Sequence, residues 1–142
     1  MFFKGLDNDQ NGTFPLPEKI VKELLYEIST LAELKVTLFI ARLTCGHSNK
    51  FIRISINQFI NGIEDENGNL ISKGVGLARQ HVIRGIRLAE ERGTILVYTT
   101  GPKGKQVKWY FWNTKENKKL VEALRQKHIS INELVKSRTS LF

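Results

Sequence analysis

The sequence predicts an α+β domain that is mainly helical, with a small three-stranded antiparallel sheet and a C-terminal helical extension. Three observations lead to this fold class. Several segments repeat apolar residues at helical spacing behind a capping residue, two β-rich segments flank a Gly-Pro turn, and a short β-branched segment precedes them. The length of 142 residues suits one compact domain, and 41% hydrophobic residues suffice for its core.

The first residues are predicted to be an arm followed by a helix. Residues 1–13 are polar and rich in Asn, Asp and Gly, which is typical of a flexible N-terminal arm. A helix is expected over 17–28, because Pro17 suits a first helical turn and an apolar stripe follows it. The stripe consists of Ile20, Leu24 and Ile28, with Val21 and Leu25 beside it.

A second helix is expected to begin after Thr30, because Thr30 and Glu33 match the Thr-x-x-Glu capping box. Its apolar positions are nearly continuous, so we expect a central, largely buried helix that ends near Gly46. The short β-branched segment 51–55 is then predicted to be a strand.

Two further helices are expected before the β-rich segments. Ser55 and Gln58 form a second capping box, which opens a helix in INQFINGI. The polar segment EDENGNLISKG, residues 64–74, is predicted to be a loop. The next helix is expected over 78–91, with Gly93 as its stop. Its apolar stripe consists of Val82, Ile86 and Ala89.

The segments TILVYTT and QVKWYFWN are predicted to be strands, joined by the turn GPKGK into a hairpin. Residues 109–112 are four aromatics in a row, so two should face the core and two should face away from it. Core packing and cover of the sheet are favoured for them over stacking on bases or on a partner. Thr114 can cap a following helix, and Ser130 with Glu133 matches a third capping box before a short last helix.

An isolated hairpin is marginal in water, so segment 51–55 is expected to pair with it as a third strand. The predicted order is then helix, helix, strand, helix, loop, helix and hairpin. This is the order of a winged helix-turn-helix domain, which we expect over residues 14–113, with a C-terminal helical tail over 114–142.

The charge of the chain is strongly positive and unevenly distributed. A net charge of +8 favours a polyanionic partner, either nucleic acid or an anionic membrane surface. Residues 1–50 hold six basic and six acidic side chains, whereas residues 79–108 hold seven basic and two acidic ones. The excess therefore begins in the helix predicted over 78–91. No apolar run reaches the roughly 18 residues of a membrane span, and no membrane partner is expected.

The sequence offers no catalytic or metal-binding pattern. Cys45 is its one cysteine, and the histidine nearest to it is His47, without the further ligands of a zinc site. No nucleophile elbow or paired-carboxylate motif is present, and GPKGK lacks the setting of a phosphate loop. We therefore expect no enzymatic activity, no metal and no cofactor. The single cysteine and the lack of a convincing signal peptide predict an intracellular, cytoplasmic protein.

The segment from Thr13 to Asn113 resembles the N-terminal winged-helix DNA-binding domain of phage replication protein O, a replisome organiser. The resemblance rests on TFPLP, LAELKVTLFIARLT, RISINQFINGI and GLARQHVIRGIRLAEERGTI. Ala78 departs from the family pattern, in which a serine caps the recognition helix. The resemblance implies binding to double-stranded DNA at a replication origin, in the cytoplasm of a bacterial or phage-infected cell and associated with the nucleoid. The last motif is also common among winged-helix regulators.

The predicted site residues follow from the way such domains dock on DNA. The N-terminal half of the recognition helix contacts base edges in the major groove, and lysines on the hairpin turn contact phosphates. The residues predicted to read bases are Arg79, Gln80 and Arg84. The residues predicted to contact the DNA backbone are His81, Arg87, Lys103, Lys105 and Lys108.

The expected function is sequence-specific binding of double-stranded DNA, as a replication initiator of a phage or mobile element. Two alternatives stand beside it: a winged-helix transcriptional repressor, and a winged-helix protein–protein adaptor with little DNA selectivity. The expected partner is double-stranded DNA. Replication proteins and a second copy of the chain, as a homodimer, are further candidate partners.

Overall fold

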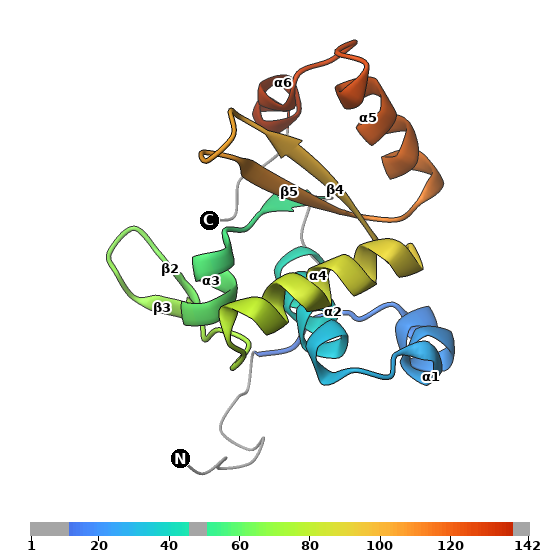
Figure 1. The fold of residues 1–142 in the computed structure, drawn as a ribbon, viewed down its shortest axis with the longest axis vertical. Helices are drawn as coiled ribbons and strands as arrows, with labels where there is room; N and C mark the ends of the chain where they lie inside the picture. Colours follow the sequence, from blue (N-terminus) through green and yellow to red (C-terminus); the bar gives the residue numbers. More distant parts are fainter. Residues whose placement is uncertain (1–11, 46–50, 138–142) are drawn as a thin grey trace.

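The computed structural model describes residues 12–45 and 51–137 of the chain. These residues form an α+β fold in which a three-stranded antiparallel sheet lies between two groups of helices (Figure 1). The strands are β1 (Phe51–Arg53), β4 (Ile95–Thr100) and β5 (Val107–Trp112), in the order β1-β5-β4. The predicted α+β class and the predicted pairing of the short strand with the hairpin are confirmed.

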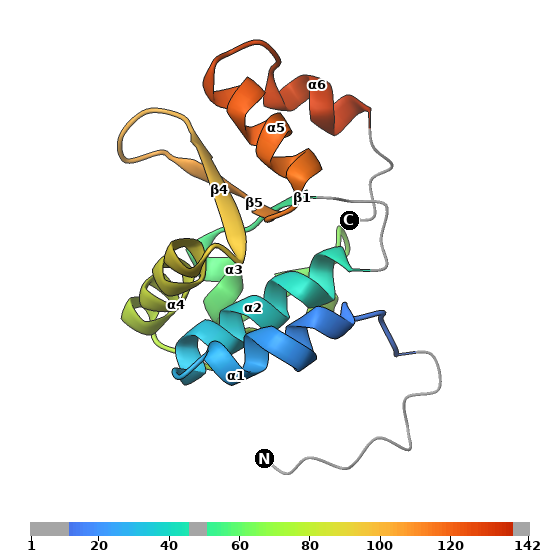
Figure 2. The same cartoon turned by 90° about the vertical axis from the view of Figure 1, so that its right-hand side faces the viewer.

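Helices cover both faces of the sheet, as Figure 2 shows from the side. One face carries α2 (Leu31–Thr44), α3 (Ile56–Asn61) and α4 (Arg79–Arg92). The other carries α5 (Lys115–Arg125) and α6 (Ile131–Lys136). The first helical segment comprises the π-helix η1 (Ile20–Leu24) and α1 (Leu25–Glu27), neither of which has a buried residue.

The capping residues named from the sequence begin their helices, but only one predicted box is complete. Ser55 and Gln58 form both hydrogen bonds of the box at the start of α3. Thr30 accepts from the backbone N–H of Glu33 at 3.3 Å. The carboxylate of Glu33 does not return to Thr30, because it accepts two hydrogen bonds from Arg92. The prediction of a reciprocal Thr30–Glu33 box was therefore wrong in its second half.

The side chains of β5 point alternately to the two faces of the sheet and pack in two separate cores. Tyr110 and Trp112 belong to the core under α2, α3 and α4. Trp109 and Phe111 belong to a second core under α5 and α6, where Leu124 is also buried. The prediction that the four aromatics serve packing and sheet cover is confirmed, since Trp109 is only 8% exposed and Phe111 is fully buried.

The segment predicted to be a loop over 64–74 contains a second hairpin. It consists of β2 (Ile63–Glu64) and β3 (Leu70–Ser72), paired antiparallel. The carboxylate of Asp65 closes the turn by accepting the N–H groups of Asn67 and Asn69. Burial of Ile63 anchors the hairpin in the main core. The loop prediction was wrong because strands of two and three residues show too short an apolar pattern to be recognised beside so many polar turn residues.

One predicted strand is shorter in the structure, and two other predicted boundaries fall among residues that the structure does not describe. The strand predicted over 51–55 ends at Arg53, because Ser55 already serves as the N-cap of α3. The predicted arm, apart from Gly12 and Thr13, and the predicted helix end at Gly46 lie outside the described residues. Among residues 12–45 and 51–137, no helix has the length and apolar character needed to cross a membrane.

Candidate nucleic-acid interface

The buried side of α4 packs closely on α2. Val82 and Ala89 are fully buried and Ile86 is 5% exposed, as the predicted stripe requires. Gly85 lies between them, and a Cβ atom built on it would come within 2.5 Å of the carbonyl oxygen of Ala32 in α2. The two backbones therefore approach as closely as a glycine allows, and this contact fixes which side of α4 faces outward.

The two ends of α4 are held differently. At the C-terminal end, Gly93 adopts a left-handed conformation with φ of 86°, and Arg92 forms a two-pronged ion pair with the buried Glu33 of α2. At the N-terminal end, the cap residue Ala78 is extended and forms no side-chain hydrogen bond. The first N–H groups of α4 consequently have no side-chain partner, as the departure at Ala78 predicts.

The outward side of α4 is rich in positive charge and hydrogen-bond donors. All of the following side chains are exposed: Arg79, Gln80, His81, Ile83, Arg84 and Arg87. None of the three arginines among them forms an ion pair with a described residue. The first turn of α4 contains no acidic residue. The predicted base-reading residues thus lie on one continuous outer surface of α4.

The β4–β5 turn adds further lysines on the side where α4 lies (Figure 2). Lys103 and Lys105 are exposed in this turn. Gly101 has φ of 91°, and a Cβ atom on it would lie 2.7 Å from the carbonyl oxygen of Lys105, so the turn requires glycine there. Lys108 is exposed at the start of β5 and lies on the same face of that strand as Tyr110.

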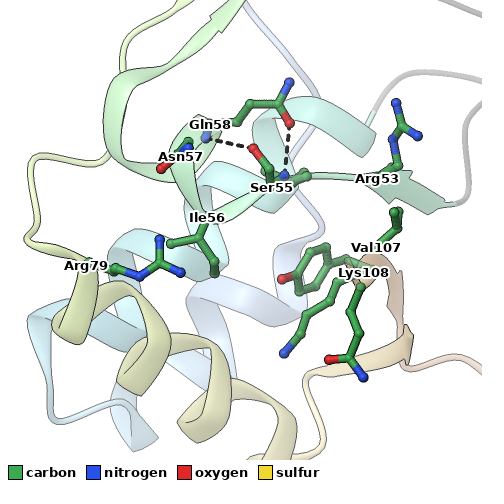
Figure 3. Close-up of a pocket in the computed structure, with 11 residues that line it drawn as sticks. Arg53, Ser55, Ile56, Asn57, Gln58, Arg79, Val107 and Lys108 are labelled. Carbon is green, nitrogen blue, oxygen red and sulfur yellow. Dashed lines mark hydrogen bonds between the residues drawn. The ribbon is translucent and has the colours of Figure 1, made fainter. Parts of the chain in front are cut away.

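A cleft of about 520 Å³ lies between the first residue of α4, the start of α3 and the turn end of strand β5 (Figure 3). Its charged lining residues are Arg53, Arg79 and Lys108, and no acidic side chain of residues 12–45 and 51–137 lines it. Its amide side chains are Asn57, Gln58 and Gln106. The fold therefore brings Arg79 and Lys108, which the sequence assigned to different elements, to one site.

The three cations of the cleft do not point the same way. Figure 3 shows Arg79 extending from α4 toward Ile56 in the first turn of α3. The guanidinium of Arg53 instead lies 5.9 Å from the ring centre of Trp109, on the opposite face of the sheet. Arg79 and Lys108 are thus the cations that remain for a molecule bound in the cleft.

Tyr110 lines the cleft and is fully buried, so it forms part of its floor. Its hydroxyl has no hydrogen-bond partner among the described residues. Burial, together with the negative charge of Glu90, raises the pKa of this hydroxyl well above its usual range, so it stays protonated as a donor at neutral pH.

The sequence singled out only Arg79 and Lys108 among the residues of this cleft. Sequence analysis gave no site role to Arg53, Asn57, Gln58, Gln106 and Tyr110, although a capping box marked Gln58 and the row of aromatics included Tyr110. The one available signal was the period of two along β5, which places Lys108 and Tyr110 on the same face. The other predicted site residues, Gln80, Arg84 and Arg87 among them, lie outside the cleft.

Metal binding and cysteine chemistry are the other candidate functions of the residues that the structure describes. No group of three His, Cys, Asp or Glu side chains there could hold a metal ion. Cys45 is partly buried, and burial raises the pKa of its thiol, which makes it a poor nucleophile. Comparison of the chain with protein-family models, curated proteins and solved structures finds no match.

Proposed function

We propose that the fold is a winged helix-turn-helix and that the protein binds double-stranded DNA in a sequence-specific manner. In this proposal α3 and α4 form the helix-turn-helix, α4 is the recognition helix, and the β4–β5 hairpin is the wing. One observation carries the proposal. The outer side of α4 presents three arginines and a glutamine without ion-pair partners among the described residues, while its inner side packs on α2.

The geometry of α4 suits the major groove. An α-helix with its side chains is about 10–12 Å wide, and the groove of B-form DNA is about 12 Å wide. Gln80 can pair with adenine, and Arg84 can fork onto guanine. His81 and Arg87, with Lys103 and Lys105 of the wing, would then contact phosphates. The close packing of Gly85 on α2 keeps the helix rigid, which lowers the entropy lost on binding.

The biological setting is proposed from the resemblance of residues 13–113 to phage replication protein O. The protein is then a non-enzymatic replication initiator of a phage or mobile element, without metal or cofactor, acting in the cytoplasm at a replication origin. Replication proteins are its expected further partners. A transcriptional repressor is a second candidate, favoured by the wide use of the α4 motif among winged-helix regulators.

In vitro selection of DNA sites is the experiment that tests this proposal. Loss of one bidentate base contact weakens binding by about 1–3 kcal/mol, or roughly 5- to 150-fold. Arg84→Ala should therefore reduce affinity by that factor and relax the preference at one base pair. Lys136→Ala, in the exposed surface of α6, is the matched control and should leave both quantities unchanged.

The salt dependence of binding separates the candidate functions. Removal of one phosphate contact, as in Lys103→Ala, should weaken binding to all sequences alike and reduce the salt slope by about 1. Repeated sites at an origin would support the initiator, and one palindrome at a promoter would support the repressor. Weak binding without selectivity and with a flat salt response would reject DNA recognition and favour the protein–protein adaptor.

A further inference from the structure

The described lining of the cleft beside the wing contains positive side chains and no negative one, and the charge of Glu90 reaches only the Tyr110 hydroxyl in its floor. Arg79 reaches it from α4 and Lys108 from β5, and both side chains are exposed. Neither forms an ion pair with a described residue, and no acidic side chain of the described part of the chain lines the cleft. Two like charges that share a cleft repel each other, so an anion between them is favoured on electrostatic grounds.

The floor of the cleft supplies a second, independent observation. The hydroxyl of Tyr110 is one of six buried side-chain atoms without a partner among the described residues, and it alone of these six belongs to a residue that lines the cleft. Its position is held firmly, because the ring packs edge-on against Phe59 with centroids 5.6 Å apart. Tyr110 also pairs with Val97 on one side and Ile52 on the other, in the middle of the sheet. A phenylalanine would fill the same core space without leaving a donor unsatisfied.

The start of α4 adds donors at the same place. Arg79 is the first residue of this 14-residue helix, and no side chain caps the turn that begins there. The N–H groups of His81 and Val82 already bond to the carbonyl of Ala78, so the positive end of the helix dipole and the N–H groups before them are what favour a negative charge. Residues of α4, β5 and the floor of the cleft thus bring donors to the lining of one cleft.

We propose that this cleft binds a phosphate group, which pairs with Arg79 and Lys108 and accepts a hydrogen bond from the hydroxyl of Tyr110. A tetrahedral phosphate offers oxygens in three or more directions, as these donors require, whereas a carboxylate offers two in one plane. The phosphate belongs either to the DNA backbone or to a free molecule. In the first case, the inference rests on the proposed function, and the cleft is the binding site of one backbone phosphate. In the second case, the inference does not depend on the proposed function.

The first experiment uses free ligands. Inorganic phosphate and thymidine monophosphate are titrated into the full chain at constant ionic strength with chloride as reference, and binding is followed by calorimetry. Saturable binding that Tyr110→Phe and Lys108→Gln each weaken about tenfold or more assigns the cleft to a free phosphate. Tyr98→Phe in β4 and Lys136→Gln in α6 are the matched controls, because neither residue lines the cleft.

Tyr110→Phe also reports on the fold. Because the hydroxyl has no partner among the described residues, the substitution should leave the Tm unchanged or raised. A marked fall in Tm without ligand would show that the hydroxyl has a structural partner, and it would overturn the proposal.

The second experiment uses duplex DNA whose phosphates are replaced one at a time by neutral methylphosphonates. If the source is the DNA backbone, one replacement weakens binding of the wild type, and the same replacement has no effect on Tyr110→Phe or Lys108→Gln. Either source supports the inference. If both variants bind free phosphate and duplex as the wild type does, the inference is refuted. If the wild type binds DNA selectively and the Tyr110→Phe and Lys108→Gln variants bind as it does, this inference alone is refuted. If the protein binds phosphate through the cleft but shows no preference among DNA sequences, only the proposed function is refuted.

Discussion

Replacing Gly85 with alanine should destabilise the protein, although the same change in an open helix is stabilising. An alanine inside a helix gains about 1 kcal/mol over glycine. At Gly85, however, the added Cβ would lie 2.5 Å from the carbonyl oxygen and 2.8 Å from the carbonyl carbon of Ala32. It would also lie 2.9 Å from a methyl group of Val36. Two of these atoms are backbone, so α2 itself must move away from α4.

The net effect follows from setting these contributions against each other. Overpacking of a core costs about 1–3 kcal/mol, and more where a backbone has to shift, so about 3 kcal/mol is a reasonable cost here. After the gain in helix propensity, the free energy of unfolding should fall by about 2 kcal/mol. For a chain of this length, such a loss lowers the Tm by about 8 °C.

Chemical and thermal denaturation followed by circular dichroism measure this loss. Gly104→Ala is the matched control, because Gly104 has φ of 88° but nothing within 4 Å of its built Cβ. It should cost only about 1 kcal/mol, from the left-handed backbone alone. If Gly85→Ala instead raised the stability by about 1 kcal/mol, α2 and α4 would not approach as closely as described, and the reasoning would be refuted.

Three further outcomes are expected. Ala78→Ser should stabilise the protein by about 1 kcal/mol in urea denaturation, because the extended cap residue of α4 then gains a side-chain acceptor; no gain would show that the turn is already satisfied. Leu124→Ala should cost about 2–5 kcal/mol, because Leu124 of α5 is only 1% exposed, and a chain cut after residue 113 should lose cooperative unfolding. A normal transition of that short chain would make α5 and α6 dispensable. Because burial raises the pKa of Tyr110 above its unfolded value near 10, its contribution to stability is complete below about pH 10 and is lost as the pH rises further. Absorbance at the tyrosinate band should then show Tyr110 ionising only with unfolding, and ionisation in the folded protein would contradict the burial.

Local patterns were sufficient for the elements other than the β2–β3 hairpin, and for the capping residues at the starts of four helices. Thr30, Ser55, Thr114 and Ser130 each accept a backbone hydrogen bond from the residue three positions on. A cap depends only on its own turn, so the sequence of that turn is enough to predict it. The inner and outer sides of α4 were predictable for a similar reason, since the helical period alone separates them.

Contacts between distant segments were not predictable in this way. Glu33 and Arg92 are 59 residues apart, and the local sequence around Glu33 fits a capping box equally well. Burial decides which partner the Glu33 carboxylate takes. Glu33 is 1% exposed in the fold, and a buried carboxylate is stabilised more by pairing with a cation than by a hydrogen bond from a backbone N–H. The cleft has the same character, because it is assembled from β1, α3, α4 and β5.

Arg79 shows what the fold adds to the helical pattern. The helical period places it on the outer side of α4 with Arg84, and on this basis both were expected to read bases. The fold gives them different surroundings, because Arg79 lines the cleft beside the wing and Arg84 does not. A guanidinium paired with a phosphate in the cleft cannot fork onto a guanine at the same time, so the two roles of Arg79 exclude each other. Loss of affinity for all sequences in Arg79→Ala would assign Arg79 to phosphate, and a relaxed preference at one base pair would assign it to the bases. Arg84→Ala should relax the sequence preference at one base pair in either case. The two variants together therefore distinguish base recognition by α4 from phosphate binding in the cleft.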